Sequence, residues 1–436
     1  MSFKLYKKGI SIILTFILVL LSGCSMKGDF DSQIKADASK FDFKQASKVI
    51  SAAAGHDFNK AFLESLGEDL VKQIQTEILN GTYTEKTWHD VTGSSFHVMK
   101  DMVDRNMSAD NITNKGDNGG PSFSVAFVGD ILLDTNFAPM VHANKKGGVL
   151  NCIDDNLVKY LNACDVFLIN NEFSIGERGE RLKGKTWTFQ VKPERIQILK
   201  DLGADIVSLA NNHVYDFGEI GFLDTLEHLK KAELPYIGAG KNLSNASKAH
   251  YFIINGYKIG IIAASRAEKN YFTPVAEENR PGIMGTYDST KFVEAIRNAD
   301  AQCDYLMVYV HWGTENSTKL EDAQTTMARE YIDAGADAII GGHTHCLQGM
   351  EFYKNAPIVY SVGNFWFNSK SLDSCVVTLN FDRELNVQVH YTPLAQKGCE
   401  TYLLKTAEER RALFDRVESY EPKGVRISDD GIVTPS

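Results

Sequence analysis

The sequence predicts an α/β fold in which two packed sheets carry helices on both outer faces. Two observations lead to this prediction. Between about residues 122 and 250, short apolar runs alternate with amphipathic helical segments, which is typical of parallel strands joined by helices. Beyond residue 250, several pairs of apolar runs are separated by two-residue turns, which is typical of antiparallel hairpins. The 436 residues suffice for one large domain with additions, or for two domains.

The N-terminus has the features of a bacterial secretory signal. Lysines precede an apolar run over residues 10–21, which is shorter than the roughly 20 residues of a membrane-spanning helix. The run ends in Leu-Ser-Gly-Cys, which resembles the lipobox of bacterial lipoproteins. We therefore expect residues 1–24 to be a lipoprotein signal peptide and lipobox, with lipid attached to Cys24. An uncleaved anchor helix is the alternative, and both place the rest of the chain outside the cytoplasm, on the plasma membrane.

Composition and charge narrow the function classes. The formal net charge is −10 and no basic run stands out, so we expect no nucleic-acid partner. The cysteines that follow Cys24 contain no C-x-x-C spacing, although the expected compartment permits disulfides. We expect mostly free, buried thiols rather than a disulfide framework.

Residues 25–121 are expected to form a helical spacer and linker. Apolar residues recur at helical spacing over 42–54 and 59–79, and 98–103 allows a further short helix. The stretch 108–121 is rich in Asn, Asp and Gly, which is typical of a linker. We assign no chemistry to this segment.

The main domain is expected over residues 122–395. Its expected strands are 124–130, 165–172, 204–213, 235–239, 304–313 and 338–340. The expected helices are 149–162, 193–202, 220–231, 289–299 and 319–334. Hairpins are expected over 251–264 around Asn255-Gly256, over 350–353 and 357–362 around Lys354-Asn355, and over 375–381 and 386–391. Residues 396–436 are expected to form a C-terminal helix, 406–417, and a polar tail.

Metal-ligating side chains stand at the C-terminal ends of the apolar strands. They are Asp130, Glu172, Asn212, His311, His343 and His345. Because neighbouring strand ends meet at one edge of a sheet, these side chains are expected to converge in one cleft. Each residue alone is better explained as a turn residue, an exposed residue or a packed histidine, whereas a shared metal site explains all of them together. Oxygen ligands mixed with imidazoles suit Mn, Fe or Zn.

These strand ends resemble the motif series of the CapA family of poly-γ-glutamate capsule biosynthesis proteins, relatives of the calcineurin-like metallophosphatases. The motifs are Gly129-Asp130, Asn171-Glu172, Asn211-Asn212-His213 with Asp216 and Gly218, His311-Trp312-Gly313, Gly342-His343-Thr344-His345, Glu351 and Tyr360-Ser-Val-Gly-Asn-Phe365. The resemblance covers about residues 122–395. It implies a four-layer α/β/β/α sandwich, metallophosphatase-like, with a two-metal site between the sheets.

The resemblance also implies how the ligands divide between the two metals. One metal would use Asp130, Glu172 and His345, and the other Glu172, Asn212, His311 and His343. His213 would donate a proton or stabilise developing charge, and Asp216 is assigned to the catalytic group with it. Leu132 stands where the phosphatases usually have a histidine ligand, so the first site would have fewer protein ligands. We therefore expect one or two divalent ions per chain.

Two functions in capsule synthesis or export remain open at this point, and a lipid-anchored hydrolase unrelated to capsule is a third possibility. One is a metal-dependent hydrolase acting on an ester or amide of a cell-envelope polymer. The other is a non-enzymatic polymer-binding or assembly component of a capsule export complex, with membrane subunits as partners. Arg178, Arg181 and Lys185 are expected to contact an anionic polymer such as polyglutamate, with a solvated loop as the alternative. Trp187 in the same loop is expected to fold over the cleft, or else to serve in ordinary packing.

Overall fold

The computed structural model describes residues 41–436 except 55–57, 59, 83–88, 90–92, 105 and 269–270. The chain divides into two compact units, Met1–Ser108 and Ala109–Ser436. The expected signal peptide and Cys24 lie outside the described residues. Within the described part of the chain, no helix is both long enough and apolar enough to cross a membrane.

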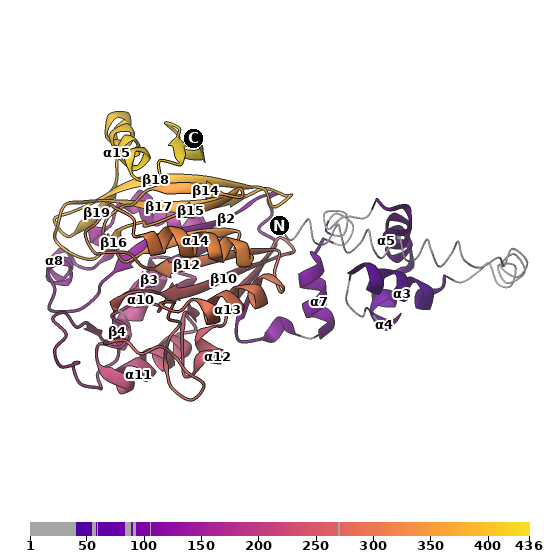
Figure 1. Ribbon diagram of the computed structural model, residues 1–436, viewed down its shortest axis with the longest axis horizontal. Helices are drawn as coiled ribbons and strands as arrows, with labels where there is room; N and C mark the ends of the chain where they lie inside the picture. Colours follow the sequence, from indigo (N-terminus) through magenta and orange to yellow (C-terminus); the bar gives the residue numbers. More distant parts are fainter. Residues whose placement is uncertain are drawn as a thin grey trace, which may run out of the picture. The chain divides into compact units, whose positions relative to one another are not determined.

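The described part of the first unit is helical (Figure 1). Its helices are α3 (Phe43–Ala54), α4 (Lys60–Leu66), α5 (Glu68–Asn80) and α7 (Phe96–Asp104). The single helix expected over 59–79 is in fact two helices, because Gly67 has a φ of 91°, which no helix adopts. Ile50, Phe58 and Val71 are fully buried in the small apolar core of this unit.

The second unit contains two large sheets. The first has the order β1 (Ile112–Gly116), β9 (His250–Ile254), β10 (Tyr257–Ser265), β12 (Tyr305–His311), β13 (Ala338–Gly342), β15 (Ala356–Val359) and β14 (Met350–Tyr353). The second has the order β20 (Val425–Ile427), β21 (Ile432–Pro435), β18 (Val387–Lys397), β17 (Leu372–Phe381), β2 (Phe123–Ile131), β3 (Val166–Asn171), β6 (Ile206–Ser208) and β7 (Tyr236–Ile237). In the second sheet, β16 (Asn364–Trp366) also pairs with β2, and β19 (Glu400–Leu403) pairs with β18.

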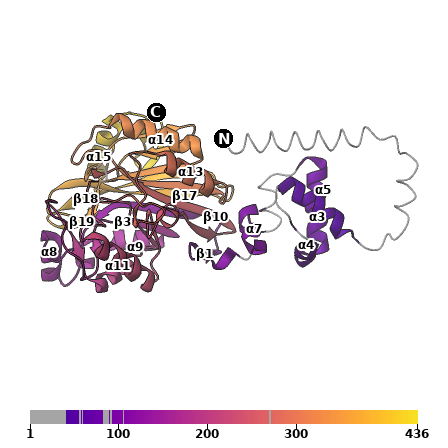
Figure 2. The same ribbon diagram turned by 60° about the horizontal axis from the view of Figure 1, so that its bottom comes forward.

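Alternating side chains of the strands build three apolar layers. On β2, Val125 and Phe127 face the other sheet, whereas Ala126 and Val128 belong to the cluster on the helix side. The helices α9 (Asp155–Ala163), α10 (Ile196–Asp201) and α11 (Gly218–Lys231) pack on the ten-stranded sheet, and α13 (Thr290–Asp300) and α14 (Asp322–Ala334) on the seven-stranded one. Figure 2 shows α13 and α14 on one side of the strands and α9 and α11 on the other. The predicted four-layer α/β/β/α sandwich is therefore confirmed.

Most expected elements of the second unit are present, with shifted ends. The helix expected over 149–162 is a 3₁₀ turn, Leu150–Cys152, followed by α9, whose N-terminus is capped by Asp154 through a bond from the Asn156 amide. The helix expected over 193–202 likewise begins as a 3₁₀ turn, Pro193–Arg195. The strand expected over 204–213 ends at Ser208, and the residues beyond it form a loop.

The three predicted hairpins are confirmed. Asn255 and Gly256 between β9 and β10 have φ values of 49° and 76°. Lys354 and Asn355 between β14 and β15 have φ values of 53° and 71°. Positive φ at both central residues is what a type I′ hairpin turn requires. β17 and β18 form the third hairpin.

The two ends of the second unit were predicted less well. The expected linker contains β1, which pairs in parallel with β9. The expected C-terminal tail contributes β19, β20 and β21 to the ten-stranded sheet, beside the helix α15 (Ala407–Ser419). These strands have three to five residues each, so they are too short to show the alternation of apolar and polar residues that a longer strand displays.

Candidate metal centre

Five strands, β2, β3 and β6 of one sheet and β12 and β13 of the other, bring the predicted ligands to one edge of the two sheets. Asp130 lies near the end of β2, level with Asn170 of β3. His311 ends β12, level with Gly342 of β13. Glu172 follows β3 directly, and Asn212 lies in the loop after β6. Chain segments up to about 215 residues apart therefore contribute side chains to one buried cluster.

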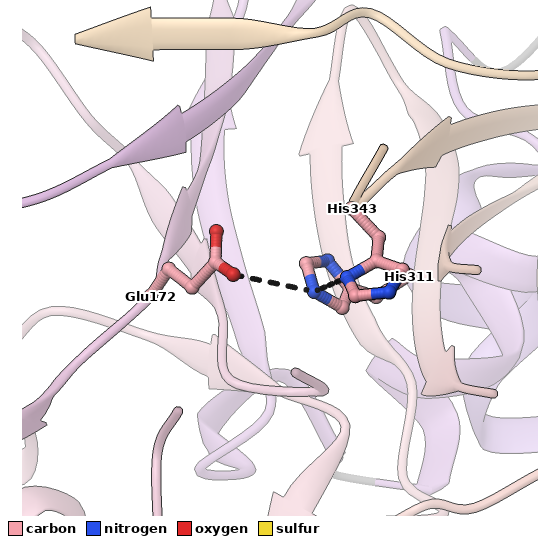
Figure 3. A group of neighbouring side chains, drawn as sticks. All are labelled: Glu172, His311 and His343. Carbon is pink, nitrogen blue, oxygen red and sulfur yellow. Dashed lines mark hydrogen bonds and ion pairs between the residues drawn. The ribbon is translucent and has the colours of Figure 1, made fainter. Parts of the chain in front are cut away.

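One group of donor atoms surrounds the Nε2 atom of His311. That atom lies 2.9 Å from Asn212 Oδ1, 3.0 Å from His343 Nδ1 and 3.5 Å from Glu172 Oε1. Figure 3 shows Glu172, His311 and His343 turned toward one another. Spacings of about 3 Å are those found between ligand atoms around one ion with bonds of roughly 2.0–2.2 Å. The structure thus assembles the four residues that were assigned to the second metal.

A second group shares Glu172 with the first. Asp130, Glu172 and His345 each offer a ligand atom within 4.8 Å of the others. His345 Nδ1 lies 3.1 Å from Asp130 Oδ2. Leu132 packs instead into the apolar cluster on the helix side of the ten-stranded sheet, with 1% of its surface exposed. This group therefore has three protein donors, as expected from the leucine at position 132.

Burial sets the charges of the cluster. Burial lowers the pKa of His311 to about 3 and the pKa of His343 well below its usual range, so both imidazoles are neutral and present lone pairs. Burial and the neighbouring Asp130 raise the pKa of Glu172 well above its ordinary value. Burial opposes the ionisation of Asp130, but a hydrogen bond and the nearby charge of His345 hold the pKa of that carboxyl below its ordinary value.

The backbone at the cluster adopts conformations that side-chain-bearing residues rarely take. His343 has a φ of 90° and His345 a φ of 56°. Gly342, which precedes them, has no room for a side chain, because a Cβ there would lie 2.6 Å from the Tyr309 hydroxyl. Such conformations persist only where the surroundings enforce them, and they are concentrated at functional sites.

His213 and Asp216, the predicted catalytic pair, are hydrogen-bonded to each other. His213 Nδ1 lies 2.8 Å from Asp216 Oδ2, which also accepts a bond of 2.7 Å from the Phe189 amide. Asp216 is fully buried and 6% of the His213 surface is exposed. The His213 ring packs at 4.4 Å from the ring of Phe189. Asp216 therefore fixes the orientation of the imidazole through Nδ1.

The three cations expected to contact a polymer lie in different environments. Lys185 is buried beneath the loop, with 3% of its side chain exposed, and its Nζ lies 2.8 Å from Asp216 Oδ1 and 3.1 Å from Glu268 Oε2. Arg178 is exposed but is paired with Asp224 of α11. Arg181 is exposed and stacks on Phe217. The neighbouring Trp187 is 61% exposed, and its ring meets the edge of the half-buried Phe137 ring with 5.9 Å between the centroids.

Sequence reasoning missed three residues of the cluster. Asn170 donates 2.7 Å to Asp130 Oδ1 and is itself held by a 3.0 Å bond from Asn211. Asn364 Oδ1 lies 2.8 Å from His345 Nδ1. Tyr309 stands two residues before His311 on β12, so period-two alternation places both on the same face of the strand. That alternation was the available signal for Tyr309, and the Gly-Asn motif was the signal for Asn364.

The donor set fits a divalent cation. Glu172 Oε1 is buried and accepts no hydrogen bond within the described residues, although it faces two neutral imidazoles. Two buried carboxylates that repel each other, with lone pairs of imidazole beside them, are the ligands that Mn, Fe or Zn prefer. Glu172, which belongs to both donor groups, would connect two such ions.

Residues 124–369 match the family described as bacterial capsule synthesis protein PGA_cap. The chain belongs to this family. The match lies within the 122–395 range in which the sequence motifs resemble CapA. The family therefore accounts for most of the second unit and for every predicted ligand.

Curated relatives carry matching descriptions. The PGA biosynthesis protein CapA of Bacillus subtilis (strain 168) is 31% identical over 280 residues, covering 62% of this chain and 71% of that protein. The capsule biosynthesis protein CapA of Bacillus anthracis is 28% identical over 263 residues, covering 58% of this chain and 62% of that protein. Similarity to solved structures is distant: the NAD nucleotidase NadN of Haemophilus influenzae has a TM-score of 0.38 and 15% identity, over 69% of this chain and 63% of that one.

Proposed function

We propose that this protein is a metal-dependent hydrolase that cleaves an ester or amide of an anionic cell-envelope polymer during capsule synthesis or export. The observation that carries the proposal is the convergence of Asn212, His343 and Glu172 on His311 Nε2, at distances that suit one ion. Membership of a capsule synthesis family supports the capsule context. The Bacillus subtilis relative is named for PGA biosynthesis, which favours poly-γ-glutamate as the polymer.

The residues have distinct tasks in this proposal. Asp130, Glu172 and His345 would hold one ion and Glu172, Asn212, His311 and His343 the other, with Mn, Fe or Zn as the metals. Such ions, when bound, supply Lewis acidity and lower the pKa of bound water. His213 is oriented by Asp216 and offers Nε2 for proton transfer. Lys185 forms an ion pair with Asp216 at 2.8 Å, so its part is to hold the His213–Asp216 pair in place rather than to bind polymer.

The remaining expectations belong to the same proposal. The chain is attached to the outer face of the plasma membrane through a lipid on Cys24, and capsule-synthesis membrane subunits are its partners. Separating membrane and soluble fractions of cells that produce a Cys24→Ser variant tests the anchor. Release of the variant into the soluble fraction is expected, and retention on the membrane would refute the lipid attachment.

The enzymatic proposal is tested by separating metal binding from turnover. The full chain is purified in detergent, its metal content is determined by elemental analysis, and hydrolysis of poly-γ-glutamate and of simple esters is followed. His213→Gln is expected to keep its metal and to lose turnover by roughly 100-fold or more, because His213 is not a ligand. His228→Gln, on the outer helix α11, is the matched control.

A non-enzymatic binding or assembly role is the second candidate, and Leu132 favours it. With leucine in an apolar cluster at that position, the first donor group has three protein ligands, and a weakly held first ion would favour binding over hydrolysis. Metal-loaded protein that hydrolyses no substrate, with His213→Gln still supporting capsule formation, would decide for this role. Leu132→His is expected to raise metal content toward two ions per chain, if one is missing.

A further inference from the structure

Three buried polar atoms in the metal centre have no hydrogen-bond partner among the described residues. They are Glu172 Oε1, the Tyr309 hydroxyl and Asn364 Nδ2. All three residues are fully buried. Buried polar groups in native structures are nearly always paired, so unpaired groups gathered at one centre indicate a polar ligand that completes them.

A metal ion alone cannot satisfy all three atoms, because they differ in whether they donate or accept hydrogen bonds. Glu172 Oε1 is an acceptor, which a cation satisfies. Asn364 Nδ2 is a donor only, and a cation accepts no hydrogen bond. The Tyr309 hydroxyl can also donate. The centre therefore requires an oxygen atom that faces Asn364, in addition to any cation that faces Glu172.

The orientation of the Asn364 amide follows from its neighbour His345. His345 Nδ1 lies 3.1 Å from Asp130 Oδ2 and 2.8 Å from Asn364 Oδ1. A carboxylate can only accept, so Nδ1 carries the proton and donates to both oxygens. Reversing the amide would place Nδ2 against a ring N–H, donor against donor. The amide nitrogen therefore points away from His345 and is free to donate elsewhere.

Asn364 is held rigidly in this position. It begins β16 and pairs with Asp130 of β2. The two strands approach closely at Gly129, where a Cβ would lie only 1.7 Å from the Gly363 carbonyl oxygen. The Ser374 hydroxyl donates to the Asn364 carbonyl. A donor fixed in this way stabilises negative charge without reorganising, as the donors of an oxyanion hole do.

On the opposite sheet, the absence of a side chain at Gly342 leaves room for the Tyr309 hydroxyl. An ideal Cβ on Gly342 would lie 2.6 Å from the Tyr309 hydroxyl and 3.5 Å from Asp130 Oδ1. Glycine at position 342 therefore lets the Tyr309 hydroxyl and the Asp130 carboxylate face the same small volume.

We propose that Asn364 is a further catalytic residue, whose Nδ2 donates a hydrogen bond to an oxyanion bound in the metal centre. The oxyanion is a substrate oxygen, either of a phosphate ester or of the tetrahedral species formed when an ester or amide is attacked. This inference rests on the proposed metal centre and adds the group that recognises the substrate oxygen. Water bound to metal is the other source of such an oxygen, and the experiment separates the two.

The test measures binding of inorganic phosphate to the full chain, loaded by dialysis against Mn²⁺, by calorimetry. Asn364→Asp keeps an acceptor for His345 but replaces the donor by an anionic oxygen. It is expected to retain wild-type metal content and to bind phosphate at least roughly 10-fold more weakly. Asn364→Ala removes the donor without adding charge and is expected to show a loss of similar size. Asn316→Asp adds the same charge at an exposed asparagine and serves as control.

Three results would overturn the inference. Unchanged phosphate affinity in both Asn364 variants would mean that only water or metal meets the phosphate. Loss of metal from both variants would show that Asn364 acts by holding His345. Failure of metal-loaded wild type to bind phosphate would exclude an oxyanion ligand. Phosphate binding that depends on Asn364, in a protein that hydrolyses nothing, would instead sustain this inference and refute the proposed hydrolase.

Discussion

Carboxylates lie at both ends of the parallel strands, but their hydrogen-bond partners differ between the two ends. At the N-terminal end, an aspartate directly precedes each of four strands. Asp165, Asp205, Asp304 and Asp337 precede β3, β6, β12 and β13 respectively. Each accepts a hydrogen bond from a backbone amide of an adjacent strand: Ser124, Phe167, Lys258 and Leu306, at 2.7–2.8 Å. These aspartates tie neighbouring strands together.

At the C-terminal end, no backbone amide in the described part of the chain donates to the carboxylate of Asp130 or Glu172. Within the described residues, Asp130 is met by side chains, namely Asn170 and His345. One oxygen of Glu172 accepts no hydrogen bond from any of these described residues. The same residue type therefore stabilises the sheet at one edge and is left to bind a ligand at the other. The difference shows that the partners of a buried carboxylate, more than its burial, distinguish a structural role from a functional one.

The largest expected effect comes from removing the carboxylate that belongs to both donor groups. Glu172→Gln is expected to weaken metal binding by about 100-fold or more, equivalent to about 3 kcal/mol, because a neutral amide is a poor ligand. The unfolding free energy of the metal-free protein is expected to stay the same or to rise, since one carboxyl oxygen is unpaired and the other accepts only a long bond of 3.5 Å from Asn170. Elemental analysis after dialysis and denaturant unfolding in chelator measure the two quantities.

Glu177→Gln, an exposed glutamate on the loop that follows, is the control for Glu172→Gln. A decrease of more than about 2 kcal/mol in the stability of metal-free Glu172→Gln would place Glu172 with the strand-tying aspartates. In that case the contrast between the two edges would fail.

Asp337 gives the next largest effect, as a dependence of stability on pH. Burial raises the pKa of Asp337 to about 7, against an unfolded value of about 3.9. The folded chain therefore binds this proton more tightly, and stability is expected to fall as the pH rises from about 4 to 7. From pH 5 to pH 8 the expected loss is on the order of 2–3 kcal/mol.

Asp337→Asn separates this contribution from other titrating groups. Its amide oxygen can still accept from Leu306, but the side chain cannot ionise. Denaturant unfolding of both proteins at pH 5 and pH 8 is the measurement. The titratable neighbours of Asp337 include Asp300, whose pKa burial raises to about 6 and which is present in both proteins. Equal pH slopes in wild type and variant would contradict the prediction.

The sequence predicts the functional residues at the C-terminal edge of the strands better than it predicts the roles of the aspartates at the N-terminal edge. Glycine pairs, adjacent asparagines and histidines after apolar runs are unusual enough to predict Asp130, Glu172 and His343 as neighbours. The aspartates at the other edge follow a small residue and precede an apolar run, a common pattern that carries no chemistry by itself. Their partners are backbone amides, which no sequence pattern displays.

Other features depended on contacts that form only in the folded chain. Lys185 was predicted to contact polymer because it follows two arginines in a loop, but the fold turns it inward to Asp216. β1 and the short C-terminal strands have few residues and draw their stability from the sheets they join. The break between helices at Gly67 is the exception, because a glycine within a helical pattern can be recognised from the sequence as a possible helix end.

The smallest expected effect comes from removing one aspartate that links two strands at the N-terminal edge. Asp165 accepts from the Ser124 amide at 2.8 Å and from the Asn118 side chain at 2.9 Å. Asp165→Ala leaves both donors without this acceptor and is expected to lower the unfolding free energy by about 1–2 kcal/mol. Asp165→Asn retains an oxygen acceptor and should lose less. Both variants are expected to keep wild-type metal content, and a loss of metal in either would mean that the two edges are coupled through β2 and β3.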